Sequence, residues 1–245
     1  MNYFTAALLG IVQGLTEFLP LSSSGHLVIA QHIVPGFSQP GVFFDAILHA
    51  GTLMSVFFFF KGKLVNYFKK HAFLIIIATI PAFMIGFLFQ SVIEGFFESI
   101  RVVGFALLLT GIMNFLTDKA KPKRKKISQK DSLLVGIFQG VSLIPGISRS
   151  GATIFSASTL GIDKRKAAEF SFIISIPAVV GANILQTVKH GASGGVETGH
   201  YLIGFMTAFI SGYLAIFLVF DTLKKGKFKV FAAYCILLGG IILAI

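Results

Sequence analysis

The sequence predicts an all-α polytopic membrane protein with six transmembrane helices and two re-entrant helical hairpins in an inverted-topology repeat. Composition, the lengths of the apolar segments and an internal duplication predict this fold class. Of the 245 residues, 55% are hydrophobic and 13% are charged, and the mean hydropathy is +0.84. These values exclude a soluble domain. The single cysteine, Cys235, excludes a disulfide framework and a cysteine metal site.

Six segments are apolar and long enough to cross a bilayer. They cover residues 43–60, 72–92, 102–117, 167–188, 201–221 and 228–245. Two further apolar stretches, residues 4–30 and 132–160, are interrupted midway by Pro and a polar cluster. Each half has about 10 to 15 residues, roughly 15 to 22 Å of helix, which is too short for a ~30 Å hydrocarbon core. We interpret both stretches as re-entrant hairpins, because broken helices at membrane depth need a protein or cavity lining.

The distribution of cations supports the hairpin interpretation. If each hairpin returns to its own side, 18 of the 21 Lys and Arg residues fall in loops on one face of the membrane. These loops are residues 61–71, 118–131, 161–166 and 222–229. Basic loops stay in the cytoplasm, so both termini are predicted to lie outside it. The same clustering accounts for the formal charge of +11, and no nucleic-acid partner is expected.

The two broken stretches are similar in sequence. Residues 10–26, GIVQGLTEFLPLSSSGH, align without a gap with residues 136–152, GIFQGVSLIPGISRSGA, and seven of 17 positions are identical. Each copy precedes three predicted spans, and the loop charges give the copies opposite orientations. We therefore predict a single membrane domain, residues 1–245, with a first repeat at 1–117 and an inverted second repeat at 132–245. Such repeats place the binding site near the midplane.

The second hairpin tip indicates an anion-binding site. It contributes Ser148, Arg149, Ser150 and Thr153. An Arg at membrane depth is unfavourable by several kcal/mol unless it is paired, and its planar guanidinium suits a phosphate group. Hydroxyl donors at the start of a half-helix add a positive dipole end. The alternative is an Arg149–Glu17 ion pair that only holds the hairpins together.

The first hairpin tip adds candidate catalytic groups. Gln13 and Glu17 stand on one helix face, where a carboxylate can hold a divalent cation or orient a base. His26 has an imidazole that suits proton transfer. A serine nucleophile, Ser23 or Ser22, activated by His26 is chemically reasonable, and attack by water is equally open.

Other residues near the first tip complete the predicted site. Ser22 and Ser24 are hydroxyl donors for an anion, and Gly25 allows close approach of the backbone. Asp45 and His49 lie one turn apart in the first predicted span. They either line the same cavity or form polar contacts between helices.

The hairpin stretches resemble the two signature motifs of the bacterial undecaprenyl-diphosphate phosphatase family, the integral-membrane type associated with bacitracin resistance. GIVQGLTEFLPLSSSGHL and LIPGISRSGAT carry the resemblance, and FFDAILHAGTL at residues 43–53 is similar to the family's first span. The resemblance implies removal of the terminal phosphate of a C55 polyprenyl diphosphate, which regenerates the carrier lipid of peptidoglycan synthesis. It also implies a divalent cation, Mg or Ca, and a site in the bacterial cell membrane that opens to the outer face.

One position of the first motif affects the metal prediction. The family's motif has Glu or Gln, three residues, then Glu, and here these positions are Gln13 and Glu17. The motif thus keeps one carboxylate, which can suffice because Mg²⁺ takes few carboxylates besides substrate phosphates. An inverted-repeat transporter or lipid flippase is the alternative function. The sequence does not determine the oligomeric state, and a homodimer stays open.

Overall fold

The computed structural model describes residues 2–33, 42–190 and 198–244, and these residues form α-helices joined by loops. This all-helical architecture confirms the predicted fold class at that level. The helices, in chain order, are α1 (Tyr3–Phe18), α2 (Ser23–Ile33), α3 (Val42–Phe59), α4 (Leu64–Leu88), α5 (Gln90–Phe96), α6 (Ile100–Lys119), α7 (Gln129–Val141), α8 (Arg149–Thr159), α9 (Lys164–His190), α10 (Thr198–Lys224) and α11 (Lys229–Ala244).

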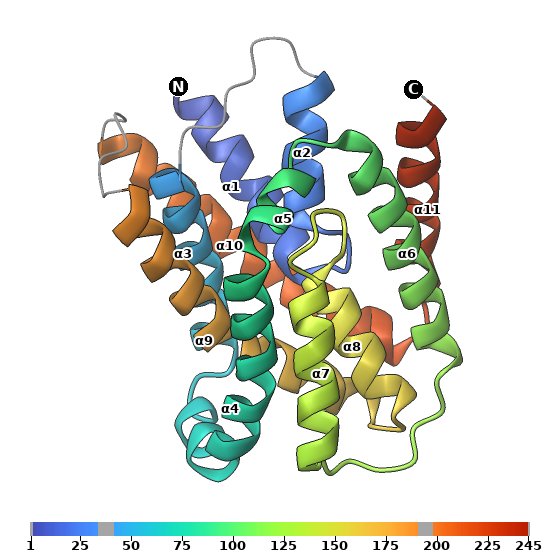
Figure 1. Cartoon of the computed structure of the whole chain (residues 1–245). Coiled ribbons are helices and arrows are strands. Elements are labelled where there is room, and N and C mark those ends of the chain that lie inside the picture. The colour runs from blue at the N-terminus through green and yellow to red at the C-terminus, as the bar shows by residue number, and fades with distance from the viewer. Residues whose placement is uncertain (1, 34–41, 191–197, 245) are drawn as a thin grey trace.

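Several helices have the length and composition of membrane spans. Within the described residues, α4, α6, α9 (over Lys164–Leu185) and α10 are long and apolar enough to cross a bilayer. The shorter apolar helices Phe43–Phe59 and Lys229–Ala244 run beside them (Figure 1). Large apolar side chains such as Phe83 and Phe87 on α4 are more than 60% exposed. An apolar outer surface suits contact with lipid.

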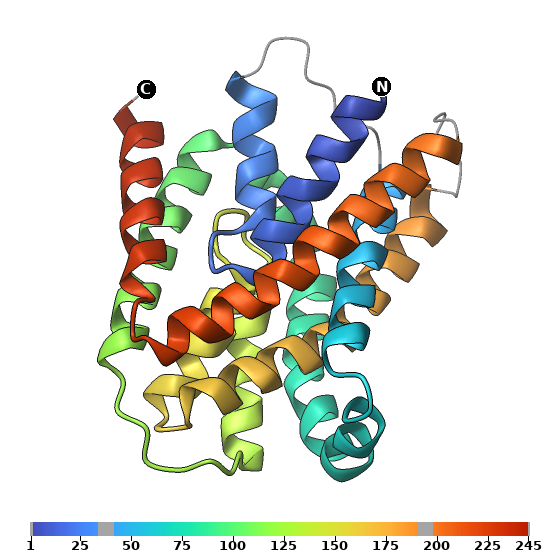
Figure 2. The same cartoon turned by 180° about the vertical axis from the view of Figure 1, so that it is seen from behind.

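Two helical hairpins enter the bundle from opposite ends. Figures 1 and 2 show α1 and α2 descending from the end where the chain starts and finishes, and α7 and α8 rising from the other end. α1 has 16 residues, and the other three arms have 11 to 13. At 1.5 Å per residue the longest arm is about 24 Å, and the hairpin tips meet inside the bundle.

The helices extend beyond the apolar segments that predicted them. α4 begins at Leu64 rather than at residue 72, because Lys69 and Lys70 of the predicted basic loop belong to the helix. Lys has a good helix propensity, so its charge marks the membrane boundary and not the helix end. At the other end α4 stops at Leu88 instead of residue 92, and the short helix α5 follows.

The entry of the second hairpin is fixed by a charged cap. Arg124 Nη1 and Nη2 donate to the two carboxylate oxygens of Asp131 at 2.6 and 2.7 Å. Ser128 and Asp131 form a capping box at the start of α7. The hydrogen bonds from Arg124 lower the pKa of Asp131 to about 2, so the carboxylate stays charged at neutral pH. The start of α7 is thereby held against the preceding loop.

Close packing of α1 on α10 orients the first hairpin. A Cβ atom added to Gly14 would lie 2.5 Å from Ala208 O and 2.6 Å from Gly212 N. Only glycine allows the two helix backbones to approach so closely. This contact fixes the rotation of α1, and with it the direction of Gln13 and Glu17.

Candidate functional site

A cavity of about 300 Å³ lies where the two hairpin tips meet. Residues of α1, α2, α3, α4, α7 and α9 line it together with the loop before α8 and the first residue of α8. The sequence-predicted residues that line the cavity are Gln13, Glu17, Ser22, Ser23, Ser24, Asp45, His49, Ser148 and Arg149. The fold therefore brings residues of both hairpin stretches into one site.

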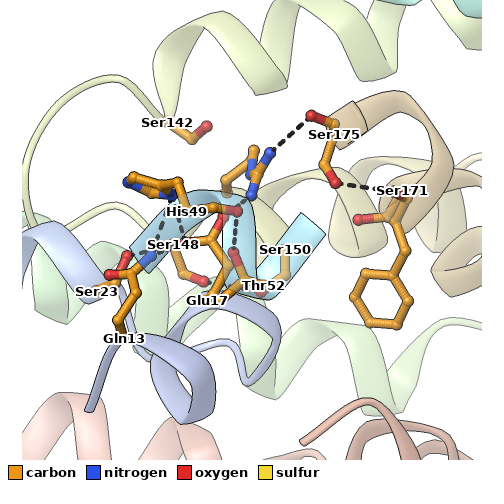
Figure 3. A network of polar contacts seen from close by, with 12 residues as sticks. Gln13, Glu17, Ser23, His49, Thr52, Ser142, Ser148, Ser150, Ser171 and Ser175 are labelled. Carbon is orange, nitrogen blue, oxygen red and sulfur yellow. Dashed lines mark hydrogen bonds and ion pairs between the residues drawn. The ribbon is translucent and has the colours of Figure 1, made fainter. Parts of the chain in front are cut away.

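An ion pair between Glu17 and Arg149 joins the hairpins at this cavity. Arg149 Nη2 donates to Glu17 Oε1, and the side chains of Glu17 and Arg149 are 6% and 19% exposed, respectively. Glu17 Oε2 accepts hydrogen bonds from Gln13 Nε2 at 3.0 Å and from Ser23 Oγ at 3.2 Å (Figure 3). One guanidinium and two donors thus compensate the buried carboxylate. The ion pair that the sequence analysis gave as the alternative to an anion site is present, and the Ser23 hydroxyl belongs to the same network.

Equivalent serines cap the two half-helices that start at the tips. Ser148 Oγ accepts a hydrogen bond from Gly151 N at 3.2 Å, and Ser22 Oγ accepts one from Gly25 N at 3.3 Å. Both serines line the cavity. The N-termini of α2 and α8 therefore start at its wall, where backbone N–H groups and the helix dipole favour an anion.

The tips touch each other through a hydrogen bond to Ser22 and through close packing of two glycines. Gly146 N donates to Ser22 Oγ at 3.1 Å, and a Cβ atom on Gly25 would lie 2.9 Å from Gly146 Cα. Helix α6 holds both tips, because Thr110 Oγ1 donates to Gly146 O at 2.8 Å and Asn114 Nδ2 donates to Pro20 O at 2.8 Å. The two tips are thus fixed to each other and to α6 beside the cavity.

Four sequence-predicted residues do not line the cavity. Ser150 Oγ donates to Leu19 O at 3.3 Å, and Thr153 Oγ1 lies 2.6 Å from Ser171 Oγ on α9. Gly25 packs at the junction of the tips. The His26 ring bonds to Ser22 O and to the Tyr234 hydroxyl. These four residues support the site from behind the cavity wall.

Some lining residues were not predicted as site residues. Gln139 lines the cavity and is the residue that the internal duplication aligns with Gln13, so the repeat carried a signal for it. Asn183 also lines the cavity, and its Nδ2 donates to Ala46 O at 3.3 Å. It lies in an apolar part of α9, and no sequence motif indicates it as a site residue. His49 Nδ1 lies 3.1 Å from Gln13 Nε2, which confirms that His49 faces this network.

The oxygen ligands at the site fit a weakly coordinated divalent cation. Within the described residues, no three His, Cys, Asp or Glu side chains form a cluster that could hold a metal. The first motif offers one carboxylate, Glu17, and the amide oxygen of Gln13, whose nitrogen already bonds to Glu17. Mg²⁺ commonly binds one or two protein oxygens and completes its shell with water and phosphate. The donor set therefore fits a cation that binds together with a phosphate ligand.

Comparison with known proteins gives a match over almost the whole chain. Residues 6–241 match the family described as bacitracin resistance protein BacA. The Undecaprenyl-diphosphatase of Syntrophotalea carbinolica is 39% identical over 261 residues, which cover 100% of this chain and 99% of the relative. An Undecaprenyl-diphosphatase 4 of Bacillus cereus is 41% identical, with 100% and 98% covered. The Undecaprenyl-diphosphatase of Carboxydothermus hydrogenoformans is 38% identical, with 100% and 98% covered.

Because the tips pack closely at Gly146, we expect Gly146→Ala to lower the free energy of unfolding strongly. Gly146 has φ 96°, and a Cβ atom there would lie 2.7 Å from Ala106 Cβ and from Val103 O. Gly226→Ala is the matched control, because Gly226 has φ 62° and no atom within 4 Å of an added Cβ. We expect about 1–2 kcal/mol of strain in the control and about 1–3 kcal/mol more for Gly146→Ala. Thermal unfolding in detergent measures both, and equal losses would contradict the close contact.

Proposed function

Because this chain belongs to the family of the bacitracin resistance protein BacA, we propose that it removes the terminal phosphate of undecaprenyl diphosphate. The products are undecaprenyl phosphate and inorganic phosphate, and the recycled carrier lipid serves peptidoglycan synthesis. The observation that carries the proposal is the Arg149–Glu17–Ser23 network at the wall of the cavity.

The Arg149 guanidinium is the proposed anchor for the diphosphate. In the structure it bonds to Glu17, and its Nη1 lies 3.5 Å from Ser175 O, which is a long hydrogen bond. Its planar fork of donors can bind two phosphate oxygens at once. The N-termini of α2 and α8 add backbone donors beside it. Together these groups stabilise the negative charge that develops on the phosphoryl oxygens during transfer.

Glu17 is the proposed acceptor of the nucleophile's proton. The Ser23 hydroxyl already donates to this carboxylate at 3.2 Å. Attack by Ser23 Oγ on the terminal phosphorus breaks the bond to the bridging oxygen, and undecaprenyl phosphate leaves with that oxygen. Water then cleaves the phosphoserine and releases inorganic phosphate. A water molecule that attacks the terminal phosphorus directly would give its proton to the same carboxylate.

A divalent cation, Mg²⁺ or Ca²⁺, is the proposed cofactor. Glu17 and the Gln13 amide oxygen would hold it, with the diphosphate oxygens as further ligands. When bound, the cation would neutralise charge on the diphosphate and polarise its phosphorus–oxygen bonds. Glu17 would then be shared between the cation and the Arg149 side chain.

The apolar part of the cavity wall suits the polyprenyl chain. Ala82 of α4 and Leu143 beside the second tip line the cavity together with Ala178 and Val179 of α9. Burial of the first isoprene units against this wall would direct the diphosphate towards Arg149. Each buried methylene contributes about 0.8 kcal/mol. This wall gives the site a means to prefer a lipid diphosphate over a soluble one.

The four helices of the described residues that are long and apolar enough to cross a bilayer, together with the family membership, make the chain a multi-pass membrane protein. We propose six transmembrane helices, two re-entrant hairpins and an inverted repeat in the bacterial inner membrane. The opposite entry of the hairpins and the basic loops at one end support this topology (Figure 1). We further propose that the site opens to the outer, periplasmic face, because the hairpin with Glu17 and Ser23 enters from the end opposite the basic loops.

Phosphate release from the purified protein tests the proposed function. We expect the protein to release inorganic phosphate from a long-chain polyprenyl diphosphate in detergent. We also expect a lower rate after chelation of divalent cations, because the motif holds the proposed cation with one carboxylate, Glu17. A colorimetric phosphate assay measures both. A rate of phosphate release no higher than the background, from folded protein with each of several divalent cations, would contradict hydrolysis and favour transport.

Arg149→Lys tests the role of the guanidinium. An ammonium group cannot bind two phosphate oxygens in one plane, so we expect Arg149→Lys to lose about 10²-fold or more of kcat, nearly as much as Arg149→Ala. Steady-state phosphate release gives kcat and KM for each variant. A Lys variant within a few-fold of wild type would mean that a point charge is sufficient.

Thiol labelling tests the proposed opening to the outer face. In a Cys235→Ser background, Ser24→Cys places a single thiol at the cavity wall. We expect a membrane-impermeant maleimide to label intact cells at this position, and polyprenyl diphosphate to protect it. Labelling that occurs only in inverted vesicles would place the opening on the cytoplasmic side.

A further inference from the structure

His26 is bonded in a way that removes its ring from the cavity chemistry. Its Nδ1 atom lies 2.7 Å from Ser22 O, and its Nε2 atom lies 2.7 Å from the Tyr234 hydroxyl. A carbonyl oxygen only accepts, so Nδ1 carries the proton, and a neutral ring then accepts the tyrosine O–H at Nε2. Both nitrogens are therefore used, and the ring does not line the cavity.

The partner of His26 is a residue in an unusual backbone conformation. Ser22 has φ 70° and is the only non-glycine residue with positive φ in the described part of the chain. This left-handed conformation is unfavourable for a residue with a Cβ and persists only where the surroundings enforce it. Ser22 O accepts from His26 N at 3.2 Å and from His26 Nδ1 at 2.7 Å. The imidazole makes the shorter of these two bonds.

The conformation of Ser22 determines the direction of Ser23. Ser23 is the first residue of α2, and its hydroxyl reaches Glu17 across the cavity wall at 3.2 Å. A rotation about the Ser22 backbone would swing Ser23 away from that carboxylate. A displacement of about 1 Å at a reacting group can lower a rate about 10²-fold.

We propose that Tyr234 and His26 form a positioning relay that holds Ser22 in its left-handed conformation and so directs Ser23 towards Glu17. The inference rests on the proposed phosphatase function and gives His26 a positioning role instead of the proton transfer predicted from sequence. It also assigns a role to Tyr234 of α11, which no motif indicates. The next residue, Cys235, supports the same tip, because its Sγ lies 3.5 Å from Pro20 O. Two consecutive residues of α11 therefore contact the first hairpin.

A pair of substitutions at His26 separates positioning from proton transfer. In His26→Asn the side-chain amide can replace the Nδ1–H donor to Ser22 O, but it cannot transfer a proton. We expect His26→Asn to keep kcat within about tenfold of wild type with an unchanged pH–rate profile, and His26→Ala to lose about 10²-fold. A folded His26→Asn protein as inactive as His26→Ala would overturn the relay and support proton transfer.

Tyr234→Phe tests the other end of the relay. The substitution removes only the hydroxyl, and Tyr213→Phe is the matched control, because the Tyr213 ring packs against Phe59 and Phe217 of α3 and α10. We expect Tyr234→Phe to lower kcat several-fold at constant KM, the control to change neither, and Tyr234→Phe to add no loss in a His26→Ala background. An equal further loss in that background would contradict the relay.

Hydrogen–deuterium exchange gives a readout that does not depend on activity. We expect faster amide exchange over residues 19–26 in Tyr234→Phe than in wild type or Tyr213→Phe, because the first tip loses a tether. Unchanged exchange in this segment would refute the relay even if activity fell. An inactive wild type with faster exchange in Tyr234→Phe would instead refute the proposed phosphatase function and leave the relay standing as a structural device.

Discussion

The ion pair between the buried Glu17 carboxylate and the partly buried Arg149 guanidinium is the interaction on which the arrangement of the two hairpins depends. Removal of one partner from a buried pair typically destabilises a protein by about 3–5 kcal/mol, because the other charge is left uncompensated. The pair forms only if both tips reach the same depth from opposite ends. The contact of Gly25 with Gly146 and the hydrogen bonds from α6 to both tips make that depth unique.

The same pair explains why a stable fold can present a reactive site. An anionic ligand at the proposed site would compete with Glu17 for the Arg149 guanidinium, and its binding would weaken this contact and free the carboxylate beside Ser23. The other contacts of the junction are neutral hydrogen bonds and close backbone packing, which do not involve these charges. The chain can thus exchange one ionic contact without opening the bundle, which is one form of the compromise between stability and activity.

The sequence predicts the helical fold and the meeting of the tips, but not which side of each half-helix faces the cavity. Composition, cation distribution and the similarity of the two stretches are properties of whole segments. A fold prediction based on them does not depend on the exact helix boundaries. The rotation of α2 is set by tertiary contacts. Ser23, Ser24 and Leu27 line the cavity, so the 3.6-residue period turns His26 towards α11. Thr153 faces α9 for the same reason, and Tyr234 becomes relevant only through a contact 208 residues away in sequence.

The capping serines have a consequence for the two halves of the chain. The alignment that pairs Ser22 with Ser148 also pairs Ser23 with Arg149, and these are the first residues of α2 and α8. One copy of the duplicated unit therefore supplies a hydroxyl, and the other supplies a cation, from the same structural position. The stretches also differ at the position of Glu17, which aligns with Leu143, so each stretch supplies one partner of the ion pair.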